Sequence, residues 1–265
     1  MSVCSKLARS GALAFGFILT VLSATPAVAR AVDEPLARFE TPICPGIVGL
    51  ELASAEAMVW RIRANLEEFG RRLAPPETCE ANFLVSFVPS GQRMIDALRR
   101  SNGWLFTDMN RAERDSLFAE TGPARAVLRT VERTRDGMTV GRRDNLVQAP
   151  QARGWMAHSK IYSAVRKDIV TAQVIFDADA VKDLTIAQLA DYATFRALAH
   201  TLPQTETARA ASILSLFDAN GARPQSLTDF DKAYLGALYS GIPNIPGPMR
   251  RLALEQATGM TIFRQ

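Results

Sequence analysis

Histidine is the scarcest of the residues that could carry chemistry in this chain. The 265 residues include only two, His158 and His200. A catalytic zinc usually takes three protein ligands, and the H-E-x-x-H motif needs two histidines four positions apart on one helix. Neither arrangement can be drawn from these residues, although a site that joins both histidines to one carboxylate stays formally open. We therefore expect no metal and no other cofactor.

Other catalytic signatures are missing as well. There is no G-x-S-x-G elbow and no glycine-rich phosphate loop, and adjacency in His158-Ser159 does not aim a base at a nucleophile. A cysteine nucleophile would require a free thiol. Pairs of carboxylates are the general chemistry that is left, with Asp191 beside Asp177, Asp229 or Asp231 as the candidates. We expect no assignable catalytic residue.

A long apolar run occurs only near the start of the chain. Lys6 and Arg9 precede an uncharged segment over 11–22, and Ala27-Val28-Ala29 follows it as a cleavage site. This order is typical of a secretory signal peptide over residues 1–29; a membrane anchor, the alternative, would need about 20 apolar residues. We expect a periplasmic or secreted protein with one domain over 30–265 and no membrane span after the signal is removed.

Cysteine is also rare. Cys4 leaves with the signal peptide, so the mature chain keeps Cys44 and Cys79. An even pair in an exported protein favours one disulfide, worth about 3–4 kcal/mol in the chain-entropy model; two buried free thiols are the alternative. The net charge of +4 falls by two with Lys6 and Arg9, so it gives little reason to expect an anionic partner.

Hydrophobic periodicity and turn residues place the elements. A central helix over 184–200 opens with a capping box of Thr185 and Gln188, and its apolar residues lie on both sides, which predicts burial. The strongest strand, 169–176, is apolar on both faces and should be central. The remaining expected elements are a poorly ordered lead-in over 30–42, helices over 54–74, 92–100, 110–120, 206–217 and 249–258 and from Thr228, a strand over 82–88, and a hairpin at Asp136-Gly137.

These elements predict an α+β fold. We expect a small, twisted, mixed sheet with the central buried helix and several covering helices. Polar side chains on that helix must find partners or reach solvent, so we take four of them as candidate binding residues: Gln188, Asp191, Tyr192 and Arg196. His200 should lie near the last carbonyls of the same helix.

Two groups of charged residues need an explanation. Six arginines make the hairpin region basic: Arg125, Arg129, Arg133, Arg135, Arg142 and Arg143. Without interleaved aromatic residues they favour a solvated face over a nucleic-acid groove, with an anionic envelope polymer as a remaining partner. Asp177, Asp179 and Asp183 follow the central strand, where a strand-to-helix turn is more common than a cation site.

Six segments are distributed over most of the mature chain: Cys44-Pro45-Gly46 and the runs 157–162, 166–169, 188–193, 213–217 and 227–231. These segments resemble a family of exported alphaproteobacterial proteins that has no assigned activity. More distantly, the order of strand, long helix, Leu-Phe segment and Asp-rich helix is similar to metzincin-type zinc peptidases. In that group the central helix carries the metal-binding histidines, and 188–199 contains none.

Three functional hypotheses follow. The first is a non-catalytic binding or envelope-associated domain on a peptidase-like scaffold, whose partner would be another envelope protein or an anionic envelope polymer. The second is a metal-independent hydrolase that uses carboxylates near Asp191. The third is a structural subunit of a larger complex, which an exposed apolar patch of several hundred Å² would favour.

Overall fold

The computed structural model describes residues 34–101, 103–107, 109–140, 159, 161–219 and 221–264, so the expected signal peptide and His158 lie outside the described residues. A four-stranded sheet has the order β1 (Pro45–Val48), β2 (Phe83–Val88), β4 (Val165–Asp177), β3 (Ala124–Thr134). β1, β2 and β4 are parallel, whereas β3 is antiparallel to β4. The predicted α+β fold with a mixed sheet is confirmed.

Strand β4 lies between two neighbours, as its apolar sequence predicted. Val174 and Phe176 point into the larger core, whereas Ile175 between them points into a smaller core on the opposite face. Both faces of β4 are therefore covered, which explains why the strand shows an unbroken apolar run rather than alternation.

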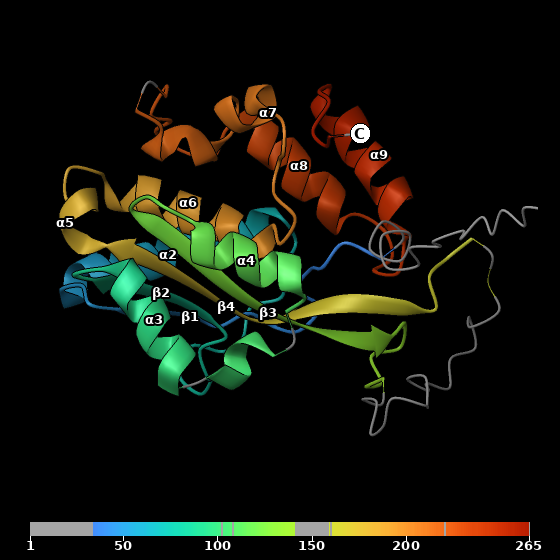
Figure 1. Ribbon diagram of the computed structural model, residues 1–265, viewed down its shortest axis with the longest axis horizontal. Helices are drawn as coiled ribbons and strands as arrows, with labels where there is room; N and C mark the ends of the chain where they lie inside the picture. Colours follow the sequence, from blue (N-terminus) through green and yellow to red (C-terminus); the bar gives the residue numbers. More distant parts are fainter. Residues whose placement is uncertain are drawn as a thin grey trace, which may run out of the picture.

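Two helices lie side by side over the larger core, α2 (Leu52–Glu68) and α6 (Ile186–Leu198). Helices α8 (Asp229–Tyr239) and α9 (Gly247–Thr258) form a further layer outside α6 (Figure 1). Every residue of α6 from Gln188 onward is buried, and Thr185 and Gln188 form the predicted capping box. The central buried helix is confirmed.

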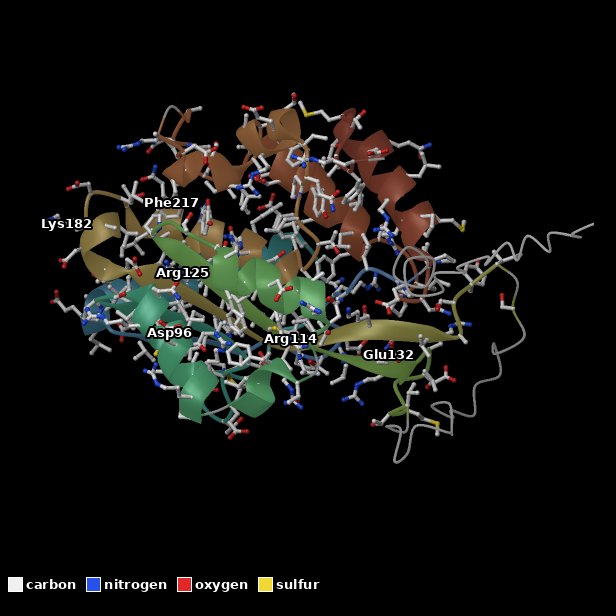
Figure 2. The ribbon with its side chains drawn as sticks, viewed as in Figure 1. Asp96, Arg114, Arg125, Glu132, Lys182 and Phe217 are labelled. Carbon is white, nitrogen blue, oxygen red and sulfur yellow. A yellow bond between two sulfur atoms is a disulfide. The ribbon has the colours of Figure 1, made fainter. Side chains whose placement is uncertain are left out.

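The other face of the sheet carries α3 (Gly91–Ser101), the short 3-10 helix η1 (Gly103–Phe106) and α4 (Arg111–Ala119). They enclose a small core of Ile95, Phe106, Leu117, Val127 and Ile175. Beyond these helices β3 and β4 continue together as an arm, on which Glu132 is labelled in Figure 2. Gly137 has a φ of +92° in the turn after β3, at the predicted Asp136-Gly137 position.

Two predicted helices were wrong in extent. The first was expected to run to the prolines at 75–76, but α2 ends at Glu68 because Gly70 has a φ of +62°. The segment 206–217 is not one helix but α7 (Glu206–Ala210) followed by the 3-10 helix η2 (Ile213–Phe217). Ser212 separates them, since its hydroxyl donates to the buried Asp231 carboxylate.

From residue 34 onward, the segment before β1 contacts the core. Phe39 is buried in the larger core, and the Arg38 guanidinium donates to the carbonyls of Leu238 and Gly241. Hydrogen bonds from a guanidinium and apolar burial therefore join this segment to the body of the fold. The turn between β4 and α6 contains the four-residue helix α5 (Ala178–Val181).

The Cys44–Cys79 disulfide is present and closes a loop of 35 residues. It joins the segment just before β1 to the turn before β2, the strand with which β1 pairs. Within the part of the chain that the structure describes, no helix has the length and apolarity needed to cross a membrane.

Candidate functional site

Asp191, the first of the expected binding residues, is buried in the contact between α6 and α2. Its carboxylate accepts two hydrogen bonds of 2.7 Å from Arg61 Nε and Nη2 and one of 2.7 Å from Asn65 Nδ2. The Leu227 N–H donates a fourth, at 3.0 Å. All of the strong acceptor positions on Asp191 are thus occupied, and its side chain is fully buried.

Gln188 lies one turn earlier on the same helix and has a structural role too. Its Oε1 accepts a hydrogen bond from Thr185 N, and its Nε2 donates to the Pro224 carbonyl at 3.0 Å. Gln188 and Asp191 therefore connect α6 to its own start, to α2 and to the segment before α8. Neither side chain is open to a ligand.

Tyr192 and Arg196 are four residues apart and share a different side of α6. The Tyr192 ring packs edge-on against Phe217 at 4.8 Å between ring centroids, and its hydroxyl accepts a hydrogen bond from Arg196 Nη1. Arg196 also forms two bonds to Glu120, of 2.7 and 3.1 Å. Burial opposes the charge on Arg196, but Tyr192 and Glu120 hold its pKa above the ordinary value.

A hollow of about 770 Å³ opens beside Arg196. Its walls come from α4, from the edge strand β3, from the segment after α6 and from α7. Of the four expected binding residues, Arg196 is the one that lines it. The other lining residues include Glu113, Ser116, Leu117 and Glu120 of α4, Ala126 and Leu128 of β3, His200, Leu202 and Gln204 after α6, and Arg209 of α7.

His200 lies in this hollow beside an ion pair. Its Nε2 is 3.5 Å from Glu113 Oε1, which also accepts a hydrogen bond of 3.1 Å from Lys167 Nζ. Burial lowers the pKa of His200 to about 4, and the Lys167 ammonium acts in the same direction. Burial alone would raise the pKa of Glu113, but Lys167 and His200 lower it. At neutral pH the hollow therefore presents a neutral imidazole beside a charged carboxylate.

The position of His200 differs from the expectation. Helix α6 ends at Leu198, and His200 lies two residues beyond, with its Nε2 next to Glu113 of α4 rather than at a helix carbonyl. Neither Glu113 nor Glu120 was expected as a neighbour of the central helix. The Asn110–Glu113 capping box was a readable signal for the start of α4, but nothing in the sequence pairs Glu120 with Arg196 across 76 positions.

The carboxylates named with Asp191 as possible partners are engaged elsewhere or exposed. Asp231 is buried and accepts bonds from the N–H groups of Ile213 and Thr228, and Asp177 accepts from the Gly91 N–H, whereas Asp229 is exposed. Neither Asp191 nor these three line the hollow. Among the described residues, the geometry thus provides no open carboxylate pair at Asp191 for a hydrolytic reaction.

The basic segment of β3 is largely neutralised inside the fold. Arg125 is buried and lies 3.4 Å from Asp177, and Arg133 lies 3.4 Å from the buried Asp168. The expectation of a solvated arginine face was therefore wrong for Arg125, because the adjacent strand β4 supplies its acidic partner. Arg142 and Arg143 lie outside the described residues.

Within the described residues, no group of three or more His, Cys, Asp or Glu side chains is placed to hold a metal ion. Comparison of the chain with protein-family models, with curated proteins and with solved structures found no match in any of the three. The functional interpretation therefore rests on the hollow and the residues that surround it.

Proposed function

We propose that this chain is a non-catalytic binding domain that acts outside the cytoplasm and takes an extended, peptide-like ligand in the hollow beside β3. The disulfide supports the compartment, because disulfides persist where the surroundings are oxidising. The hollow supports the binding role. Its volume is within the range of about 300–1,000 Å³ that is common for ligand sites.

The observation that carries the proposal is the position of the hollow along β3. This strand lies at one edge of the sheet, so one of its sides is paired with no described strand of the sheet. Ala126 and Leu128 of β3 line the hollow. An extended chain can add to such an edge through main-chain hydrogen bonds while side pockets select its side chains.

The chemistry of the walls suits a peptide. Leu117, Leu128 and Leu202 offer apolar contacts, and Gln204 and Arg209 are exposed polar groups that can reach a ligand. The acidic groups within the hollow already have cationic partners, Glu113 with Lys167 and Glu120 with Arg196. This pairing favours recognition over proton transfer, so we propose no reaction.

The sequence resemblance gives the central helix a further meaning under this proposal. In the distant similarity to metzincin-type peptidases, α6 is the counterpart of their metal-binding helix, and here it places Asp191, Tyr192 and Arg196 in structural contacts instead. The protein would then have kept a peptide-binding edge on a scaffold without the metal ligands. The expected ligand is a segment of another envelope protein.

Selection from a displayed library of random peptides tests the proposal. We expect enriched peptides that bind the purified protein and remain intact on long incubation. Replacing Ser116, an exposed α4 residue that lines the hollow, with tryptophan should weaken binding by at least about tenfold by filling the space. Asp115→Trp is the matched control, because Asp115 is the preceding residue on the helix, is largely exposed and is not part of the lining.

Two results would overturn the proposal. One is that no enriched peptide binds Ser116→Trp more weakly than it binds Asp115→Trp. The other is cleavage of a bound peptide by the purified protein, which would show that the hollow is an active site.

A further inference from the structure

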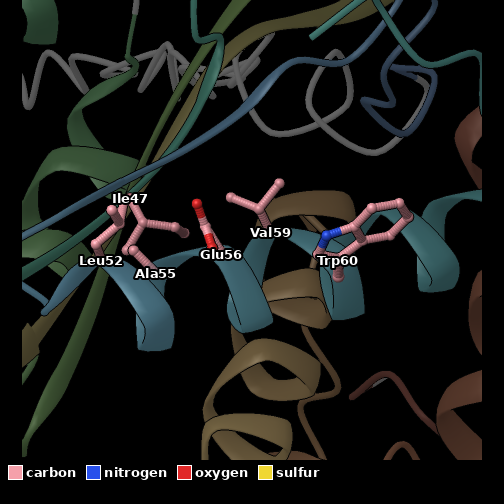
Figure 3. A pocket seen from close by; sticks show the side chains of 6 residues that line it. All are labelled: Ile47, Leu52, Ala55, Glu56, Val59 and Trp60. Carbon is pink, nitrogen blue, oxygen red and sulfur yellow. The ribbon is translucent and has the colours of Figure 1, made fainter.

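Helix α2 has an apolar surface that faces away from the core. The side chains of Leu52 and Trp60 are among the most exposed large hydrophobic groups in the described chain, at 73% and 74%, and Val48 at the end of β1 is 56% exposed. Beside them lies a groove of about 340 Å³, lined by Ile47, Leu52, Ala55, Glu56, Val59 and Trp60. Figure 3 shows the α2 side chains in a row along the helix, with Ile47 of β1 beside Leu52.

The residues on this side of α2 repeat at helical spacing. They are Leu52, Glu56, Val59, Trp60, Arg63 and Glu67, whose steps of three or four residues, with Val59 and Trp60 adjacent at the centre, keep them on one face. The row is symmetrical about the point between Val59 and Trp60. Glu56 and Arg63 are equally far from that point and carry opposite charges.

We propose that this face of α2 binds a second copy of the same chain, with the two α2 helices antiparallel about a two-fold axis between Val59 and Trp60. A two-fold interface uses the same patch on both subunits, so residue i meets residue j and j meets i. In this arrangement Trp60 of one copy covers Val59 of the other and reaches into its groove. Two apolar contacts form at the centre by symmetry.

Charge complementarity fixes the direction of the helices. The antiparallel arrangement brings Glu56 of each copy against Arg63 of the other, whereas parallel helices in register would place Glu56 against Glu56. Glu56 is exposed and has no hydrogen bond or ion pair with any described residue. Arg63 donates through Nη1 to the Ala74 carbonyl at 3.3 Å, which leaves its other N–H groups for a partner.

The extent of the patch sets the strength of the contact. One helical face with a single tryptophan falls at the small end of specific interfaces, below about 1,200 Å² of total buried surface, where association is weak. The expected species is therefore a dimer whose population rises with protein concentration in the micromolar range. The surface is separate from the hollow at β3, so failure of this proposal leaves the peptide-binding proposal untouched, and the reverse also holds.

Sedimentation velocity of the purified protein, from about 2 to about 200 µM, measures the association. We expect a shift from monomer toward dimer across this range. Trp60→Ala should weaken dimerisation by at least about tenfold, because central aromatic residues dominate small interfaces. Leu252→Ala is the matched control. Leu252 is an exposed leucine on α9 that does not line the groove, so its replacement should leave dimerisation unchanged.

A charge exchange tests the antiparallel register. Glu56→Arg alone places arginine against arginine at both symmetric contacts, and Arg63→Glu alone places glutamate against glutamate, so each single variant should be monomeric. An equimolar mixture of the two should dimerise again, because the arginine introduced in one variant then faces the glutamate introduced in the other. The double variant E56R/R63E should also dimerise by itself.

Three outcomes would overturn the proposal: a monomer at every concentration, a dimer that tolerates Trp60→Ala, or single charge variants that are not restored by mixing. Circular dichroism of each variant shows that loss of the dimer is not loss of the fold. Glu56 and Trp60 are exposed on α2, as is Leu252 on α9. Arg63 is half-buried and has one hydrogen bond to a backbone carbonyl, so we expect unchanged spectra.

Discussion

Asp191 shows how a buried acid can belong to the architecture rather than to a reaction. Its carboxylate joins α6 to two residues of α2 and to the backbone at Leu227. Arg61 is 41% exposed in its side chain and can turn to water when the acid is removed, but Asn65 and the Leu227 N–H cannot. Each buried group left without a partner costs about 1–3 kcal/mol.

We therefore predict that Asp191→Ala lowers the free energy of unfolding by about 3 kcal/mol. Urea unfolding followed by circular dichroism measures the change. Asp183→Asn is the control, because Asp183 is exposed and its loss should cost less than about 0.5 kcal/mol. If Asp191→Ala left stability unchanged but abolished a function, the structural role assigned to this carboxylate would be refuted.

His200 gives the protein a defined response to acid. Its pKa is about 4 in the folded chain and 6.5 ordinarily, so between these values the unfolded chain binds a proton that the folded chain does not. The free energy of unfolding should fall as the pH drops through this window, by up to about 3 kcal/mol at its lower end.

The neighbouring Glu113 acts in an adjoining window. Its pKa is lowered, so the stability that its charge provides is present above its ordinary value of 4.5 and is lost as the pH falls further. Stability measured against pH for the native chain and for His200→Gln separates the two. For His200→Gln, the free energy of unfolding should not fall between about pH 6.5 and 4, but it should still fall below about pH 4. Parallel curves for the native chain and the variant would contradict the assignment to His200.

At the scale of elements, the sequence predicted what local signals encode. The capping box at Thr185, the cap at Thr228, the apolar run of β4 and the burial of α6 were all readable, because caps and periodicity act within a few residues. The break at Ser212 was not readable. It depends on Asp231, which lies 19 positions away and accepts the serine hydroxyl only in the folded chain.

The candidate site was less predictable for the same reason. Of the four polar residues chosen on α6, Arg196 alone lines the hollow, because different sides of the helix face α2 and β3 and the sequence does not say which side has space. The wall on α4 comes from a segment that precedes α6 by more than sixty residues. A cavity forms where several packed surfaces do not fit closely, so the sequence of a single segment does not reveal it.

At the scale of the molecule, the two proposed surfaces lie at opposite edges of one sheet. The hollow adjoins β3, and α2 contacts β1, with β2 and β4 between them (Figure 1). Two sites should act independently when they share no residues and when no element between them switches between two positions. Trp60→Ala should therefore leave the affinity for a selected peptide unchanged within about twofold, and Ser116→Trp should leave dimerisation unchanged within the same limit.

Peptide titrations by fluorescence anisotropy, at protein concentrations where the native chain is monomeric and where it is dimeric, check this independence. A constant affinity across both conditions fits two separate surfaces on a rigid sheet. An affinity that changes on dimerisation, and does not change in Trp60→Ala, would mean that the second copy extends to the β3 edge. In that case the dimer would complete the ligand site instead of lying apart from it.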